Sequence, residues 1–362
     1  MKVLIVFNHP APYKVKIFNE LAKLVDLDVL FERTHASDRP KDFYIENKIE
    51  FNATFFHGCY LGAENTFTNK VKNYIKKNHQ NYDLIIMNGY STFAEMKAIS
   101  YMKRKGIPFV LYVNGGVIKT DSKFKAYLKR KYISSAKYYI SPCEQADDYL
   151  IHYGASKDAI FNYTYSTFYA KDVLDNPLTK EKKNQIRETY NLPKDETIIV
   201  SASQFIERKN IFQLLSVFKN RKETLLLIGS GPQLDGYNQF IKENNMTNVI
   251  IRDFMKRDEL LKLMAGCDYF ITLSKQDIYG HTTNEAMAKG LPVISSDKVL
   301  SSLHLIKNGE NGFIVDLNND NIHKAIDSLN PSMAKSALKT ARENTIEEMA
   351  KNHIEIFKQL IK

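Results

Sequence analysis

Short apolar runs alternate with helix-like segments along most of this 362-residue chain, and the alternation stops once and then starts again. Each run has few internal polar residues, which is typical of strands buried on both faces of a parallel sheet. Helices between such strands cover the two faces, so the pattern predicts doubly wound α/β units. We expect strands at 3–7, 27–32, 83–88, 108–114 and 138–141 before the interruption, and at 197–202, 225–229, 249–252, 269–272, 292–295 and 312–315 after it.

The interruption is the polar stretch 172–195, which contains Pro177 and Pro193 and predicts a linker with one short helix. A chain of this length is expected to form two domains, each with its own core. Two such domains in tandem are expected to face a central cleft, lined by the carboxyl ends of both sheets. We expect a Rossmann-like N-terminal domain over 1–175, a linker over 176–195, a Rossmann-like C-terminal domain over 196–344, and a helix over 345–362 that packs back on the N-terminal domain.

The composition narrows the class of protein. Hydrophobic residues make up 44% of the chain and charged residues 25%, which is ordinary for a soluble globular protein. No apolar run reaches the roughly 18–20 residues that a membrane-spanning helix needs. The cysteines Cys59, Cys143 and Cys267 predict neither a disulfide framework nor a zinc site, so we expect a reducing cytosol.

The formal net charge is +10, and the basic residues gather most densely in one helix-like segment. Two interpretations of that segment stay open: a basic amphipathic helix on an anionic membrane surface, or the solvated face of an ordinary helix. No zinc-finger, homeodomain, RNP or KH signature is present, so nucleic acid is not an expected partner. The cluster consists of Lys119, Lys123, Lys125, Lys129, Arg130 and Lys131, with Phe124, Tyr127, Leu128, Tyr132 and Ile133 interleaved.

The most distinctive local motif lies in residues 272–297, where Asp277 stands eight positions before Glu285. Residues 279–283 predict the turn from a strand into a helix, with that helix at 284–289. A helix start presents unpaired backbone N–H groups and a partial positive charge, so it can hold a phosphate. The two flanking carboxylates could hold the hydroxyls of a sugar and of a ribose. A nucleotide-sugar would meet both requirements at once.

Three further loops are expected to converge with this motif at the carboxyl ends of the second set of strands. The loop 201–210 carries Arg208 and Lys209, which could neutralise a diphosphate. The loop 229–232 is glycine-rich and permits close backbone approach. The loop 252–255 ends a strand at a point where backbone groups could contact the edge of a base.

The chain resembles retaining glycosyltransferases of the GT-B fold, in the large family 4 (glycosyltransferase group 1). The resemblance extends over essentially the whole chain and is specific in its second half. It implies two Rossmann-like domains and a nucleotide-sugar donor bound by the second of them. The residues that carry it are FIERKN at 205–210, GSG at 229–231, the stretch 277–292, and NGENG at 308–312.

By this resemblance, Glu285 binds the donor ribose, Asp277 binds hydroxyls of the transferred sugar, and Lys209 counters the diphosphate charge; Lys209 and Asp277 are the implied catalytic residues. Asp277 stands where Glu is usual in the family. Gln204 stands where Arg is usual, with Arg208 as a substitute for the second charge. The implied donor-binding residues are Gln204, Arg208, Lys209, Gly229, Phe254, Asp277, Tyr279, Gly280, His281, Thr282, Thr283 and Glu285.

The first domain departs further from the family pattern. Residues 8–13 replace the family's glycine-rich loop after the first strand, and Asn114 replaces a histidine often found at the end of a middle strand. The predicted acceptor-binding residues are therefore His9, Asn114 and Gly115. His281 is expected to contact phosphate or sugar rather than to exchange protons.

No metal or other cofactor is predicted. The clear Asp-x-Asp match, Asp26-Leu27-Asp28, starts a strand in the first half of the chain and is interpreted as structural. Without a metal, the departing diphosphate would be stabilised by fixed donors: Lys209, Arg208 and the helix start near Gly280. Retention, and deprotonation of the acceptor by the leaving phosphate, are implied by the resemblance alone.

The expected function is hexosyl transfer from a nucleotide-sugar, a UDP-sugar, to a lipid-linked or polymeric glycan in bacterial-type surface polysaccharide synthesis. The expected location is the cytoplasm, with peripheral contact at the inner membrane face. Two alternatives stay open: a nucleotide-sugar 2-epimerase of the same architecture, and a non-catalytic GT-B subunit that binds a partner or a glycan.

Overall fold

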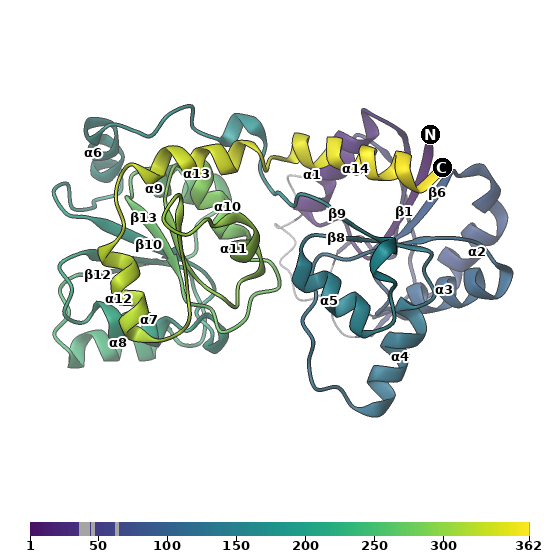
Figure 1. The fold of residues 1–362 in the computed structure, drawn as a ribbon, viewed down its shortest axis with the longest axis horizontal. Coiled ribbons are helices and arrows are strands. Elements are labelled where there is room, and N and C mark those ends of the chain that lie inside the picture. The colour runs from purple at the N-terminus through teal and green to yellow at the C-terminus, as the bar shows by residue number, and fades with distance from the viewer. Residues whose placement is uncertain (36–43, 45–47, 62–64, 362) are drawn as a thin grey trace. The chain divides into compact units, whose positions relative to one another are not determined.

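The computed structural model describes residues 1–35, 44, 48–61 and 65–361, and the chain divides into two compact units (Figure 1). The first unit comprises Met1–Thr167 together with Ile346–Lys362, and the second comprises Phe168–Thr345. The C-terminal helix α14 (Ile346–Ile361) thus belongs to the first unit, where it packs against α1 (Pro12–Ala22). The apolar face of α14 is buried there, which removes that face from water.

The first unit is built on a seven-stranded sheet in which neighbouring strands are parallel. The strand order is β3–β2–β1–β6–β7–β8–β9. The central strands are buried on both faces, which explains why they lack alternating polar residues. The strands are β1 (Lys2–Phe7), β2 (Asp26–Phe31), β3 (Asn52–Phe55), β6 (Leu84–Met87), β7 (Val110–Tyr112), β8 (Tyr138–Ser141) and β9 (Ile160–Asn162), and a separate antiparallel pair joins β4 (Cys59–Leu61) to β5 (Asn65–Phe67).

The helices of the first unit have clear start and stop signals. The helix α3 (Phe93–Lys105) begins after Thr92, whose Oγ1 accepts from the Glu95 N–H at 3.1 Å while the Glu95 carboxylate accepts from the Thr92 N–H at 2.9 Å. It ends at Gly106, which adopts a left-handed conformation with φ 64°. The other helices of this unit, besides α1 and α14, are α2 (Lys70–Asn78), α4 (Lys123–Ile133) and α5 (Glu144–His152).

The second unit is built on a six-stranded parallel sheet with the order β12–β11–β10–β13–β14–β15. Strand β10 pairs with β11 on one side and with β13 on the other, so the chain reverses its direction across the sheet at β10. In open sheets of this kind, ligands bind at that switch point, outside the carboxyl ends of the strands. The strands are β10 (Ile198–Ala202), β11 (Thr224–Ile228), β12 (Val249–Arg252), β13 (Tyr269–Thr272), β14 (Val293–Ser296) and β15 (Gly312–Val315).

Two apolar cores lie on the opposite faces of this second sheet. Val200, Leu226 and Phe270 point into one core, and Ile199 and Leu227 point into the other. The predicted doubly wound, parallel-sheet units are therefore confirmed. The helices of the second unit are α6 (Lys180–Thr189), α7 (Ile211–Phe218), α8 (Leu234–Glu243), α9 (Arg257–Ala265), α10 (His281–Ala288), α11 (Leu300–Leu305), α12 (Asn319–Asp327) and α13 (Met333–Arg342).

Candidate functional site

A pair of opposite charges lies at the switch point of the second sheet. Lys209, in the loop after β10, donates from its Nζ to Oδ2 of Asp277, in the loop after β13. The two side chains are largely withdrawn from solvent, at 12% and 17% exposed. Arg208 adds a second cation, with its Nη1 3.8 Å from the other Asp277 oxygen, Oδ1. The structure thus brings together the three predicted residues Lys209, Arg208 and Asp277.

The backbone holds these two loops in register. The N–H of Lys275 donates to the carbonyl of Arg208 at 2.8 Å, and Arg208 Nη1 donates to the carbonyl of Gln276 at 3.2 Å. The N–H of Asp277 donates to the carbonyl of Lys298 at 3.0 Å, which ties the same loop to the residues after β14. The charged pair is therefore set on backbone that is fixed from both sides.

The turn before α10 requires glycine at position 280. Gly280 has φ 84° and ψ 63°, and a Cβ at this position would lie 2.5 Å from Cγ1 of Val299. Its carbonyl accepts from Oγ of Ser301 at 2.9 Å. Helix α10 begins at His281, so the prediction that it begins at residue 284 was wrong. The helix begins directly after the left-handed Gly280, and not after the Thr282–Thr283 pair.

The side chains around this turn have different surroundings. Tyr279 is buried, and its ring centroid lies 5.3 Å from that of His281. Thr283 is fully buried, and its Oγ1 lies 3.3 Å from Oγ of Ser302. Ser302 in turn donates to Ser295 at 2.6 Å. The Thr283 hydroxyl therefore belongs to a buried hydroxyl cluster, whereas Thr282, at the second position of α10, is half-buried.

Glu285 is held by an arginine that the sequence did not single out. Arg257, the first residue of α9, donates from Nε to Oε1 of Glu285 at 2.8 Å. Its Nη2 lies 3.7 Å from Oδ2 of Asp172 and makes no hydrogen bond with the described residues. The prediction stopped at residue 255, two positions short of Arg257. The available signal was a cation at the first helical position after a strand-end loop, where a helix usually carries acids.

The loop after β11 passes very close to the loop after β10. A Cβ at Gly229, where φ is 153°, would lie 1.9 Å from the carbonyl oxygen of Ser203. The N–H of Phe205 donates to the carbonyl of Ser230 at 2.8 Å. Glycine at position 229 therefore allows the two loops to touch. Gln204 is exposed beside them, and Phe254, in the loop after β12, is 73% exposed.

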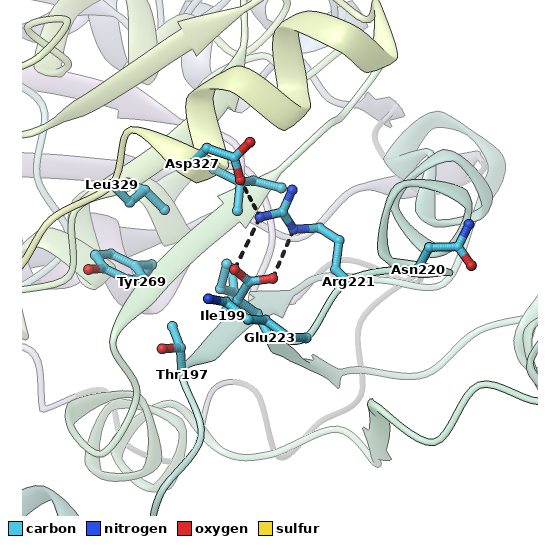
Figure 2. A pocket seen from close by; sticks show the side chains of 10 residues that line it. Thr197, Ile199, Asn220, Arg221, Glu223, Tyr269, Asp327 and Leu329 are labelled. Carbon is cyan, nitrogen blue, oxygen red and sulfur yellow. Dashed lines mark hydrogen bonds and ion pairs between the residues drawn. The ribbon is translucent and has the colours of Figure 1, made fainter.

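A cavity of about 520 Å³ lies at the opposite, amino-terminal edge of the same sheet (Figure 2). Figure 2 shows Arg221 between two carboxylates: it contacts Glu223 at 2.9 Å and Asp327 at 2.6 Å. Thr197 and Tyr269 line this cavity and lie at the beginnings of β10 and β13. None of the predicted site residues lines it, so the cavity is separate from the charged switch point.

The predicted acceptor-binding residues lie in the first unit, at the carboxyl ends of its strands. His9 follows β1, and its Nδ1 lies 3.1 Å from the hydroxyl of Tyr44. Asn114 and Gly115 follow β7, which β6 separates from β1 in the sheet. The Oδ1 of Asn114 is buried and makes no hydrogen bond with the described residues.

A buried carboxyl pair at the same edge was also missed by the sequence analysis. Glu32 follows β2, and its Oε1 accepts from the hydroxyl of Thr92 at 2.8 Å. Burial, reinforced by the neighbouring Glu95 carboxylate, raises the pKa of Glu32 to about 9. Burial therefore favours the neutral, protonated form of Glu32 over its carboxylate. No spacing rule connects residues 32 and 95, because β2 and α3 come together only in the fold.

The Asp-x-Asp element has a structural setting, as the sequence suggested. Asp26 and Asp28 lie on β2 and face Lys2, at 3.1 and 3.6 Å. Asp28 also accepts from the hydroxyl of Tyr82 at 2.6 Å. Over the described ranges, no three His, Cys, Asp or Glu side chains form a group able to hold a metal ion. Metal-independent chemistry stays a prediction.

Comparison with known proteins supports the resemblance found in the sequence. Residues 182–347 match the family model described as glycosyl transferases group 1. Over 143 residues the chain is 26% identical to N-acetyl-alpha-D-glucosaminyl L-malate synthase of Bacillus anthracis, covering 38% of this chain and 37% of that protein. Over 156 residues it is 24% identical to lipopolysaccharide core biosynthesis glycosyltransferase LpsE of Rhizobium meliloti, covering 42% and 44%. The chain thus matches less than half the length of these relatives.

Solved structures match over the whole chain. The structure of Anabaena Alr3699/HepE in complex with UDP gives a TM-score of 0.77, with 18% identity and 99% of both chains covered. A glycosyltransferase from Rickettsia africae also gives 0.77, with 16% identity and 100% of this chain and 98% of that chain covered. The predicted GT-B fold is therefore confirmed, and the group 1 resemblance is confirmed for residues 182–347. Among the described residues, no helix is both long and apolar enough to cross a membrane.

Proposed function

We propose that the protein is a retaining, metal-independent glycosyltransferase that moves a hexose from a nucleotide-sugar, with a UDP-sugar as the expected donor, onto a glycan. The observation that carries this proposal is the Lys209–Asp277 pair at the switch point of the second sheet, beside the glycine-started helix α10 that carries Glu285. The group 1 match of residues 182–347 supports it, as does the fold shared with a protein solved with UDP.

Lys209 and the start of α10 are the proposed diphosphate site. Transfer breaks the bond between the anomeric carbon and the β-phosphate oxygen, and the electron pair stays on the diphosphate. The acceptor hydroxyl oxygen bonds to the anomeric carbon, and its proton passes to the departing diphosphate. One preorganised donor at such a developing charge contributes roughly 3–4 kcal/mol. Lys209 supplies a full charge, Arg208 a second, and the first turn of α10 supplies backbone N–H groups.

The Lys209–Asp277 contact implies an exchange of partners when the donor binds. Lys209 leaves the carboxylate for the diphosphate, and Asp277 then accepts from the hydroxyls of the transferred sugar. Both residues keep a partner throughout, so neither charge is left unpaired in a partly buried position. Glu285, oriented by Arg257, is proposed to accept from the ribose hydroxyls.

The first unit is the proposed acceptor side. His9, Asn114 and Gly115 stand at carboxyl ends of its strands, where open parallel sheets bind ligands. A lipid-linked or polymeric glycan of bacterial-type surface polysaccharide is the proposed acceptor, because relatives carry names of lipopolysaccharide core and O-antigen biosynthesis. We place the reaction in the cytoplasm, with helix α4 in peripheral contact with an anionic membrane.

The donor half of the proposal is tested by thermal unfolding with a panel of UDP- and GDP-sugars. A donor present at 100 times its dissociation constant should stabilise the protein by about 2.7 kcal/mol. Lys209→Ala and Glu285→Ala should lose most of this stabilisation and cut transfer by about 100- to 1000-fold. The exposed Lys219→Ala and Glu243→Ala are matched controls that should change neither. Wild-type turnover in Lys209→Ala or Glu285→Ala would contradict the site assignment.

A further inference from the structure

A second, smaller cavity lies in the first unit, between α3 and α4, which are neighbours in the fold (Figure 1). Its volume is about 270 Å³. Lys103 and Arg104 from the last turn of α3, and Lys131 from the last turn of α4, line it. The buried side chains of Ile99 and Tyr132 also line it, so an apolar surface lies among the cations.

No carboxylate of the described residues pairs with these three cations. The ion pairs of α4 are made by Lys125 and Lys129, both with Asp121. Lys103, Arg104 and Lys131 form no ion pair with any residue in the described part of the chain. The carbonyl ends of two helices contribute about half a negative charge each, which offsets only about one of the three positive charges. The cavity therefore keeps a net positive charge after the partial negative charges of the two helix ends are taken into account.

Helix α4 carries exposed aromatic side chains, and Lys131 in its last turn lines the cavity. Phe124 is 71% exposed and Tyr127 is 62% exposed. Phe124, Tyr127 and Lys131 are spaced by three and four residues, so they lie along one face of the helix. Exposed aromatic rings beside lysines are typical of helices that lie in the headgroup region of a membrane, where the ring meets the apolar boundary and the cation meets phosphate.

We propose that the α3–α4 cavity binds the phosphate of an anionic lipid headgroup, with Lys103, Arg104 and Lys131 as the contacting cations. The hydroxyl of Ser100, which also lines the cavity, can donate to the same phosphate. Phe124 and Tyr127 then enter the interface beside the bound lipid. The inference rests on the membrane contact proposed above, but it does not depend on glycosyl transfer.

The test separates phosphate recognition from general attraction to negative charge. Binding of the full-length protein is measured by co-sedimentation with two kinds of phosphatidylcholine vesicle. One contains phosphatidic acid, and the other contains a carboxylate lipid at the same surface potential. We expect the wild type to bind the phosphatidic acid vesicles at least about 10-fold more tightly, because a phosphate offers three acceptor oxygens to the three cations and equal surface potentials do not cancel this contribution.

Two triple variants remove the same number of charges from different places. Lys103→Gln/Arg104→Gln/Lys131→Gln changes residues that line the cavity, and Lys119→Gln/Lys123→Gln/Arg130→Gln changes residues outside it, in α4 and the segment before it. We expect the cavity variant to lose the preference for phosphatidic acid. The control variant should bind both vesicles more weakly and keep the preference. Equal behaviour of the two variants, or no preference in the wild type, would overturn the proposal.

Two further readouts complete the design. Binding of soluble glycerol 3-phosphate by the wild type, without any vesicle preference, would also overturn the lipid assignment. With a soluble acceptor, the cavity variant should turn over within about twofold of the wild type, because none of its three positions belongs to the donor site. Loss of transfer in Lys209→Ala with intact vesicle preference would therefore test the two proposals separately.

Discussion

At the scale of single residues, Asp277 is the position on which the proposed donor site depends most. Its carboxylate accepts a hydrogen bond from Lys209 and lies 3.8 Å from the Arg208 guanidinium. Asp277 is therefore paired with the same two cations that would bind a diphosphate. The family pattern places a longer Glu here. The shorter side chain keeps the charge, and the structure shows that it still reaches Lys209.

Asp277→Asn should therefore separate binding from transfer. The amide removes the competing charge from Lys209, so the affinity for UDP should be unchanged or up to about 10-fold higher. Transfer should fall by about 100-fold, because the sugar hydroxyls lose a charged acceptor. Titration calorimetry with UDP and steady-state kinetics measure the two effects. Parallel losses of UDP binding and transfer would contradict the proposed exchange of partners.

Arg257 is predicted to act through Glu285. Arg257→Gln should raise the KM for the donor by about 10-fold while changing kcat by less than about threefold, because a loosened Glu285 weakens ground-state binding of the ribose. Combined with Glu285→Gln, it should add little further effect, since both variants break the contact at 2.8 Å. Additive effects of the two substitutions on donor KM would show that they act independently.

Only some of these residues could be predicted from the sequence, for a physical reason. Lys209, Asp277 and Glu285 lie in motifs whose spacing is set by local backbone, so the sequence indicated them. Arg257 contacts a partner 28 positions away on another helix, and local spacing does not predict such a contact. Local spacing likewise does not predict that the Thr283 hydroxyl points toward Ser302, 19 positions away.

At the scale of elements, the start of α10 depends on the glycine turn. Gly280→Ala should destabilise the second unit and weaken UDP binding by at least about 10-fold, because the new Cβ would meet Val299 at 2.5 Å. Gly309→Ala is a matched control: its φ is 82°, close to the 84° of Gly280, but a Cβ there meets nothing within 4 Å. Both variants bear the left-handed backbone cost of about 1 kcal/mol.

The difference between the two alanine variants isolates the contact with Val299. Adding Val299→Ala to Gly280→Ala should restore part of the UDP affinity, which isothermal titration can measure. Equal losses of UDP binding in Gly280→Ala and Gly309→Ala would show that the close contact does not shape the site.

Helix α14 brings a buried histidine into the first unit. His353 stacks on Tyr112, with ring centroids 5.6 Å apart, and burial lowers the pKa of His353 to about 3. In the unfolded chain its pKa is near 6.5, so between pH 6.5 and 3 the unfolded state binds a proton that the folded state does not. The stability from this group is complete above pH 6.5 and falls on acidification, by up to about 1.4 kcal/mol per pH unit.

His353→Phe should flatten that dependence. Urea unfolding at pH 7 and pH 4.5 should show a smaller loss of unfolding free energy in the variant than in the wild type. Groups elsewhere, such as Glu32, titrate in both proteins and cancel in the comparison. An unchanged difference between the two pH values would mean that His353 is protonated or exposed in the folded unit.

The strands predicted from sequence are those with an uninterrupted apolar run. The predicted strands at 138–141, 249–252, 269–272 and 312–315 have the observed bounds, because their apolar runs have clear polar limits. The edge strands β3 and β9 were not predicted. β3 has the sequence NATF, in which polar and apolar residues alternate, and β9 has three residues, so neither leaves a strong apolar run.

At the scale of the whole molecule, the fold is supported by structural similarity, and the proposed activity is supported by a sequence match to part of the chain. Structural similarity extends over 99% of the chain at 18% identity, whereas the sequence match to a curated relative covers 38% of it. The shared fold alone does not choose between a transferase, a nucleotide-sugar 2-epimerase and a non-catalytic subunit. The choice depends on what happens to the bound donor.

The measurement that tests the central claim most directly is release of nucleoside diphosphate from the donor that the binding panel identifies. The protein is mixed with that donor, with and without a glycan acceptor, beside Lys209→Ala. We predict release that requires the acceptor and falls by about 100- to 1000-fold in the variant. Conversion of the donor without any acceptor would indicate an epimerase, and a bound donor that is never turned over with any glycan would contradict a transferase.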